Sequence, residues 1–330
     1  MTEGEPTHVA IACQGGGSHT AFTAGVLRGL FRDWPEDHQL VGLSGTSGGA
    51  FTALCAWYGL RTGDRQKAID LLETVWLDLA AVEPVDRIAN DWLVWLTRLQ
   101  SAGVPLPEVS PYQNPASQMG ARRIKDILNR HLDFASIPGL CSQNAPELVI
   151  GTVDINAGEF HTYMNEEVTP DAVLASAAIP TLFEAVEIDD HYHWDGLFSQ
   201  NPPIDDLLTI DARRKPDELW IVQINPQLRE DEPKTMDEIY DRRNELSGNI
   251  SLNQELRFVE RVNDWIDEGY LPEEDFSKVT VRRIAKARAN HSATKVDRRP
   301  SFIKGLLQRG EERAVRFYRD HPEIQTGRSS

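Results

Sequence analysis

The chain has 330 residues, of which 40% are hydrophobic and 26% charged, and its formal net charge of −17 argues against nucleic acid as a partner. The same charge disfavours tight docking on an anionic membrane. No stretch approaches the roughly 20 apolar residues that span a bilayer, the start of the chain lacks the pattern of a signal peptide, and three scattered cysteines, Cys13, Cys55 and Cys141, predict no disulfide framework. We expect a cytoplasmic protein with at most transient contact to a membrane surface, and the oligomeric state stays open.

Strands and helices alternate at the start of the chain. Apolar runs over residues 8–13 and 40–44 are typical of buried strands. Helices are expected over residues 18–31 and from residue 48 to about residue 60. This order predicts a parallel, doubly wound sheet.

Residues 64–101 have the periodicity of two helices. In the second, Trp92, Trp95 and Leu99 share one face. We expect this face to lie in the core, and contact with a lipid surface is the alternative, because Trp prefers membrane interfaces. Residues 102–118 are rich in Pro, Ser and Asn and predict a mobile loop.

The remaining chain continues the alternation. Strands are expected over 147–153, 160–163, 183–188, 192–194, 219–224 and 279–281, and helices over 121–131, 171–178, about 237–266 and 302–318. No repeat or linker divides the sequence. We therefore expect one domain over residues 1–330, with a motif-bearing core at about 8–226 and a helical C-terminal extension at about 227–330.

A G-x-S-x-G pentapeptide, Gly45-Thr46-Ser47-Gly48-Gly49, joins the second strand to its helix. A serine on such a sharp turn projects its hydroxyl from the sheet, at the positive end of the next helix. Ser47 is therefore the candidate nucleophile for acyl transfer. The alternative is a glycine-rich turn whose serine only caps a helix.

Three glycines, Gly15, Gly16 and Gly17, follow the first strand directly. Backbone N–H groups in such a loop can converge on developing negative charge, as in an oxyanion hole. The alternative is a dinucleotide-binding loop. That alternative is weaker, because Thr20 stands where the third glycine of G-x-G-x-x-G would be.

Asp195 is the candidate base, because Trp194-Asp195-Gly196 places a carboxylate at the end of a short strand. An aspartate with the usual pKa of about 4 is a weak base, but burial beside the serine would raise that pKa. The alternative is an ordinary turn aspartate. A Ser-His-Asp hydrolase would need a late histidine in a strand–loop setting, which His291 and His321 lack, and His191 and His193 fit structural or surface roles better.

Taken together in this order, these motifs resemble the patatin-like phospholipase family. The resemblance rests on Gln14–Gly17, Gly45–Gly49, Ala175–Pro180, Asp195-Gly196 and Asn201–Pro203. It implies a three-layer α/β/α fold with a central, mostly parallel sheet. It also implies hydrolysis of fatty acyl esters of lipids, of the phospholipase A or lysophospholipase type, without metal or organic cofactor. Carried over, Ser47 is the nucleophile, Asp195 is the base of a Ser–Asp dyad, and the backbone at Gly15, Gly16 and Gly17 is the oxyanion hole.

Two positions depart from the family pattern. His19-Thr20 stand where the family usually has Arg or Lys followed by Gly, and Leu197 stands where it has Gly or Ala. The open alternatives are therefore an esterase or depolymerase acting on neutral or storage esters, a catalytically silent lipid-binding relative and, as the weakest, a nucleotide-binding protein.

Overall fold

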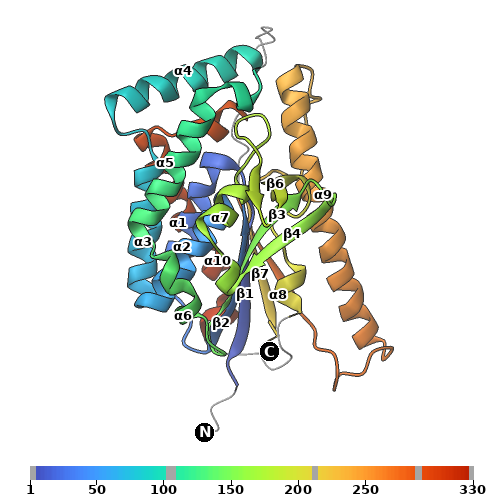
Figure 1. The fold of residues 1–330 in the computed structure, drawn as a ribbon. Coiled ribbons are helices and arrows are strands. Elements are labelled where there is room, and N and C mark those ends of the chain that lie inside the picture. The colour runs from blue at the N-terminus through green and yellow to red at the C-terminus, as the bar shows by residue number, and fades with distance from the viewer. Residues whose placement is uncertain (1–4, 102–108, 210–214, 287–291, 327–330) are drawn as a thin grey trace.

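The computed structural model describes residues 5–101, 109–209, 215–286 and 292–326. Within these residues, eight strands form one sheet (Figure 1). The strands are β1 Thr7–Cys13, β2 His38–Thr46, β3 Glu147–Asp154, β4 Glu159–Met164, β5 Val186–Ile188, β6 His191–Asp195, β7 Glu218–Gln223 and β8 Thr280–Ala285. Continuous apolar runs form the centre of the sheet, and β1 and β7 are almost wholly buried, as expected for parallel strands covered on both faces.

The sheet is mixed and mostly parallel. Its strand order is β5-β6-β3-β2-β1-β7-β8, and β4 also pairs with β3. The pairs β1/β2, β1/β7, β2/β3 and β7/β8 are parallel, whereas β4, β5 and β6 pair antiparallel. The carboxyl ends of the parallel strands therefore share one end of the sheet, and ligands of open α/β sheets bind at that end.

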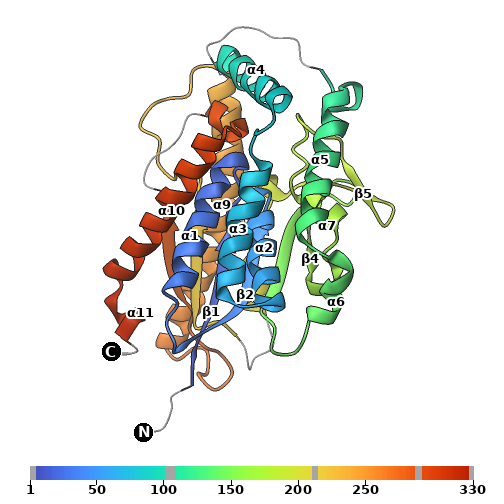
Figure 2. The same ribbon diagram turned by 90° about the vertical axis from the view of Figure 1, so that its left-hand side faces the viewer.

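Helices cover both faces of this sheet, so the predicted three-layer α/β/α architecture is confirmed (Figures 1 and 2). The α-helices are α1 Ala21–Arg32, α2 Gly48–Thr62, α3 Arg65–Leu79, α4 Pro84–Ser101, α5 Pro115–His131, α6 Ile137–Leu140, α7 Pro170–Ser176, α8 Asp205–Leu208, α9 Met236–Asp267, α10 Pro300–Asp320 and α11 Pro322–Thr326. Short 3-10 helices are η1 Gly17–Thr20, η2 Pro111–Gln113, η3 Phe134–Ser136, η4 Asn165–Glu167, η5 Gly196–Phe198 and η7 Ser292–Val296. Alternate β1 residues divide between the layers: Val9, Ile11 and Cys13 pack with α1, α2 and α10, and Ala10 and Ala12 pack with α9.

The closest packing between α1 and α10 depends on glycine. A Cβ atom on Gly25 would lie 2.0 Å from the Leu307 carbonyl oxygen, and one on Gly310 would lie 2.1 Å from the Phe22 carbonyl oxygen. We expect Gly25→Ala to lower the free energy of unfolding by about 3 kcal/mol, because the backbones must move apart. Urea denaturation measures this loss. The control is Gly305→Ala, since a Cβ there meets nothing within 4 Å, and equal midpoints for the two variants would contradict the packing argument.

The prediction that the aromatic face of α4 lies in the core is wrong. Trp92 is 59% exposed and Trp95 48% exposed. The buried side of α4 is instead formed by Asn90 and Val94. Asn90 Oδ1 accepts a hydrogen bond from the Arg298 backbone N–H at 2.9 Å. Helix α4 is thus attached through the face opposite Trp92 and Trp95. Helical periodicity alone does not reveal which face of a helix is covered.

The expected loop over residues 102–118 is too long at its C-terminal end. Residues 102–108, for which mobility was predicted, lie outside the described residues. Helix α5 begins at Pro115 rather than at residue 121. Asn114 caps it by accepting a hydrogen bond from the Ala116 backbone N–H at 3.1 Å, so the Asn-Pro pair that resembled a loop is a helix start.

Other boundaries shift for local reasons. Strand β5 covers only the second half of its predicted range, because the Phe183 backbone N–H donates a hydrogen bond to the Ile179 carbonyl oxygen and so belongs to a turn.

Helix α9 buries Leu256 and Val259 against the sheet. Phe258, next to them in sequence, is 63% exposed.

Candidate active site

Ser47 occupies the sharp turn between β2 and α2. Its backbone has φ 57° and ψ −128°, a conformation that costs energy for any residue with a side chain. A Cβ on Gly45 would lie 2.3 Å from the Gly49 backbone, and one on Gly49 would lie 2.1 Å from the Cys13 carbonyl oxygen. The glycines of the pentapeptide are therefore required by close backbone approach, as the sequence motif indicates.

Ser176, at the end of α7, is hydrogen-bonded to the Ser47 turn. The Ser47 backbone N–H donates to Ser176 Oγ at 2.9 Å, and Ser176 Oγ donates to the Gly151 carbonyl oxygen at 2.7 Å. Ser176 is fully buried. One hydroxyl thus ties the turn, α7 and the centre of β3 together.

Strand β3 brings Asp195 to the same place. Strand β4 pairs with one edge of β3 from Val149 onward. The other edge pairs first with β2, over residues 147–151, and then with β6, over residues 152–154. Thr46, directly before Ser47, is paired with Gly151, and Asp195 is paired with the next residue, Thr152. A Cβ on Gly196 would lie only 3.0 Å from Thr46 Cγ2. Two segments far apart in the chain are therefore adjacent at the carboxyl end of β2.

The Asp195 carboxyl group is completely buried. Its Oδ1 accepts a hydrogen bond from the Leu197 backbone N–H at 2.9 Å, whereas Oδ2 has no hydrogen-bond partner of normal geometry. Burial raises the pKa of Asp195 to about 7. The Ser47 side chain and the Leu197 amide lower that pKa by a smaller amount.

The glycine loop after β1 lies directly against the Ser47 turn. A Cβ on Gly15 would lie 2.8 Å from Ser47 Cβ. The Gly15 N–H already donates to Asn201 Oδ1 at 2.6 Å. In contrast, no described residue accepts a hydrogen bond from the Gly16 or Gly17 amide. Within the described part of the chain, those two amides are the unpaired backbone donors of the Gly15–Gly17 loop.

A buried amide network fixes the loop. Gln14 Oε1 accepts hydrogen bonds from the Ile224 and Asn225 backbone N–H groups after β7, at 2.9 and 2.8 Å. Gln14 Nε2 donates to Asn249 Oδ1 of α9 at 3.0 Å and to the Asn201 carbonyl oxygen at 3.2 Å. Gln14, Asn201 and Ser176 all belong to the quoted motifs, but their partners are distant in sequence and could not be identified there.

The structure shows the surroundings of His19 and Leu197, which depart from the family pattern. His19 is buried, and its Nε2 lies 2.7 Å from Thr294 Oγ1. Burial lowers the pKa of His19 well below its usual value, and the cations Lys286, Lys295 and Arg309 lower it further, so the ring is neutral at pH 7. Leu197 contacts Asp195 through its backbone N–H, which any non-proline residue could supply.

No described histidine forms a hydrogen bond with Ser47 or Asp195. His193 Nε2 lies 3.1 Å from the Tyr163 hydroxyl, and His191 pairs with Asp154. His321 pairs with Glu323, and His291 lies outside the described residues. Within the described part of the chain, no group of three or more His, Cys, Asp or Glu side chains is arranged to hold a metal ion. None of the described helices is long and apolar enough to cross a membrane.

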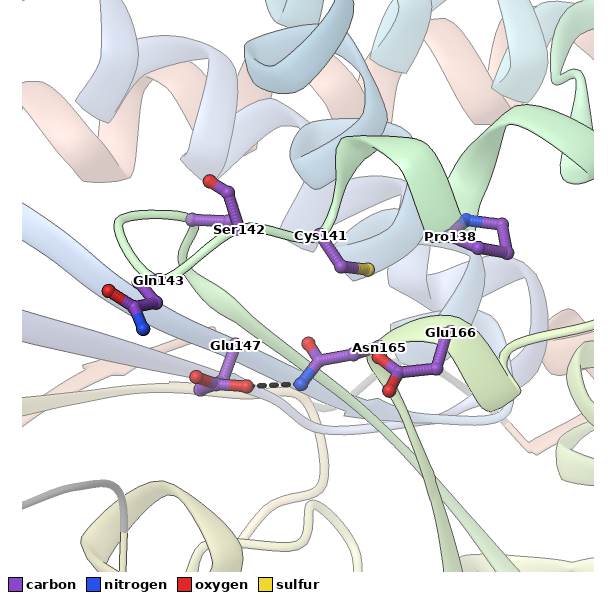
Figure 3. A pocket seen from close by; sticks show the side chains of 8 residues that line it. Pro138, Cys141, Ser142, Gln143, Glu147, Asn165 and Glu166 are labelled. Carbon is purple, nitrogen blue, oxygen red and sulfur yellow. Dashed lines mark hydrogen bonds between the residues drawn. The ribbon is translucent and has the colours of Figure 1, made fainter.

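A surface hollow of about 500 Å³ lies at the start of β3, and Figure 3 shows the side chains that line it. Its lining includes Cys141, Glu147 and Glu166, and Glu147 accepts a hydrogen bond from the Asn165 side chain. Glu147 begins β3, four residues before Gly151, which corresponds to about 13 Å along a strand. This hollow is therefore separate from the Ser47 turn.

Comparison with known proteins agrees with the motifs. A family model described as Patatin-like phospholipase matches residues 11–208. No curated protein sequence matches the chain. Among solved structures, the chain is similar to VipD from Legionella pneumophila, with 14% identity and a TM-score of 0.45 over 96% of this chain and 67% of that one. The family match covers more than half of the sequence, and the chain therefore belongs to the patatin-like phospholipases, a family of lipid acyl hydrolases.

Proposed function

We propose that this protein is a serine hydrolase that cleaves fatty acyl ester bonds of phospholipids or lysophospholipids through a Ser47–Asp195 dyad. One observation carries the proposal: a fully buried carboxyl group with an unpartnered oxygen ends a strand that pairs with β3 one residue along from the strand that leads into the strained Ser47 turn. Unpaired buried carboxyl oxygens destabilise a fold and are found mainly where function requires them.

In the proposed mechanism, Asp195 Oδ2 accepts the Ser47 proton as Oγ attacks the ester carbonyl carbon. The Gly16 and Gly17 amides donate hydrogen bonds to the resulting oxyanion. Gly15 is left out of this assignment because its amide is bound to Asn201. Asp195 then protonates the leaving alcohol as the carbon–oxygen bond breaks. It next takes a proton from water, which attacks the acyl-enzyme and releases the fatty acid.

The C-terminal extension belongs to the same hydrolase domain in this proposal. Asn249 of α9 holds Gln14 beside the glycine loop. On the opposite face, Gly310 of α10 packs directly on α1. The three cysteines are free thiols, which fits the cytoplasmic location predicted from the sequence.

The pH dependence of fatty-acid release tests the role of Asp195. The base must be deprotonated, and its pKa is about 7. We expect kcat/KM for phosphatidylcholine or lysophosphatidylcholine to rise about tenfold per pH unit between pH 5 and 6.5 and to level off above about pH 8. The assay measures free fatty acid over a panel that includes triacylglycerol as the neutral ester.

Each result on the panel has a defined meaning. Preference for triacylglycerol would replace the phospholipid assignment with a neutral esterase. A rate that is independent of pH between 5 and 8 would remove Asp195 as the base. Complete absence of fatty acid with every ester would identify a catalytically silent relative.

A further inference from the structure

The exposed side of α4 carries an apolar stripe. Ile88, Trp92 and Trp95 follow one another at spacings of four and three residues, so they lie on one face of the helix. Ile88 is 72% exposed, and the two indole rings stack with centroids 5.0 Å apart. Large apolar groups gathered on one exposed helix face indicate a surface that is covered by a partner.

This stripe lies at the same end of the molecule as the candidate active site. Figures 1 and 2 show α4 above the helical layer that contains α3 and α5, at the end of the molecule where the parallel strands finish. Helix α4 packs on η7, and η7 packs on η1 of the glycine loop. Asp86 fixes the orientation of α4 through an ion pair with Arg298 at 2.6 Å. The stripe is thus held facing away from the molecule, at the end where a lipid ester must enter.

The charge of this region is unlike that of the chain as a whole. Helix α4 carries two acidic and two basic residues, Asp86, Arg87, Asp91 and Arg98. Residues 109–120, which lead into α5 and form its first turns at the same end (Figure 2), contain no charged residue and expose Tyr112 and Met119. A neutral apolar surface on a protein of net charge −17 is complementary to a surface without net charge and poorly suited to an anionic one.

The size of the stripe decides between a protein partner and a lipid surface. The exposed parts of Ile88, Trp92 and Trp95 amount to roughly 400 Å², about half of the roughly 800 Å² per partner that a stable protein interface buries. Indole rings on an amphipathic helix are, in contrast, well suited to the interfacial region of a bilayer.

We propose that Ile88, Trp92 and Trp95 of α4 dock the protein on the surface of zwitterionic phospholipid, with the two indoles at the level of the lipid headgroups. This inference rests on the proposed function, because it supplies the contact through which the Ser47 site reaches lipid in a bilayer. Docking depends on apolar burial and not on ion pairing, and it is therefore insensitive to salt.

Vesicle binding by the Ser47→Ala protein tests this docking without hydrolysing the lipid. We expect the protein to float with phosphatidylcholine vesicles and brominated phosphatidylcholine to quench its tryptophan fluorescence. The double variant W92A/W95A should bind about tenfold more weakly, or worse, since binding scales with buried apolar area. Trp265→Ala is the matched control, because Trp265 is exposed near the C-terminal end of α9, and it should bind like its parent.

Several outcomes would overturn the proposal. These are no flotation with phosphatidylcholine, binding only to vesicles that contain anionic lipid, equal binding by W92A/W95A, or a dimer in sedimentation that W92A/W95A abolishes. Circular dichroism and a urea midpoint establish that the double variant is folded. Hydrolysis of a soluble short-chain ester by the unmodified protein is measured alongside. Vesicle binding without ester hydrolysis would refute the proposed function and leave the docking surface intact.

Discussion

Replacing Ser47 by alanine should lower the rate of fatty-acid release by about 10,000-fold or more, because no other group can form the acyl-enzyme. Labelling by a fluorophosphonate probe should disappear in the same variant. The change removes one oxygen atom and keeps Cβ, so the turn held by Ser176 should remain folded.

The matched control for this substitution is Ser142→Ala. Ser142 is exposed and lines the hollow at the opposite end of the sheet. The Ser142→Ala protein should retain full fluorophosphonate labelling and full activity. A Ser47→Ala protein that still reacts with the probe would place the nucleophile elsewhere.

Asp195→Asn should lower the rate of fatty-acid release by about 1,000-fold or more. An asparagine can keep the hydrogen bond from the Leu197 N–H, but its amide nitrogen cannot accept the Ser47 proton. Fluorophosphonate labelling should slow by a similar factor, and the pH dependence between pH 5 and 8 should vanish. Unchanged labelling would exclude Asp195 as the base. The control is Asp205→Asn, at the start of α8 and exposed.

The same substitution should raise stability at alkaline pH. Burial raises the pKa of Asp195 from 3.8 to about 7 in the folded state. The unfolded chain releases this proton near pH 4, whereas the folded protein keeps it up to about pH 7. The stability that this proton contributes therefore falls between about pH 4 and 7 and is lost once the pH has risen through 7. Asparagine does not titrate. The difference in unfolding free energy, variant minus parent, should become more positive from pH 5 to 8, by at most about 3 kcal/mol, because about two pH units separate pH 5 from the folded pKa and each corresponds to about 1.4 kcal/mol.

Urea denaturation of both proteins at pH 5 and pH 8 measures this difference. Other titrating groups are shared by the two proteins and cancel in the comparison. A difference that is constant between the two pH values would show that Asp195 is ionised throughout. If Asp195→Asn is more stable than the parent protein but inactive, the buried carboxyl group lowers the stability of the fold and is needed for activity.

The centre of the fold could be predicted from the sequence because its strands are continuous apolar runs, as in residues 219–224. The Ser47 turn could be predicted for a similar reason, since close backbone approach demands glycine on either side. Both features are local in the chain, and the residues themselves carry the information.

Long-range partners could not be predicted in the same way. The helical period of α4 was correctly identified, but the side that is buried depends on Asn90 and Asp86 meeting Arg298, more than 200 residues away. Likewise, Asn201 and Ser176 stand in recognisable motifs, yet the groups that they hold come from other segments. Sequence patterns give the period of an element and not the neighbour that covers it.

The adjacent pairing of Thr46 and Asp195 with residues 151 and 152 of β3 has an evolutionary consequence. The β3 residues that pair with Thr46 and Asp195 are one step apart along the strand, about 3.3 Å, and this step sets where the Ser47 turn and Asp195 lie relative to each other. The long connections from α2 to β3 and from β3 to β6 do not define this separation. Insertions and deletions in those connections can therefore accumulate during divergence, and new substrate preferences can arise there, while the reacting groups keep their spacing.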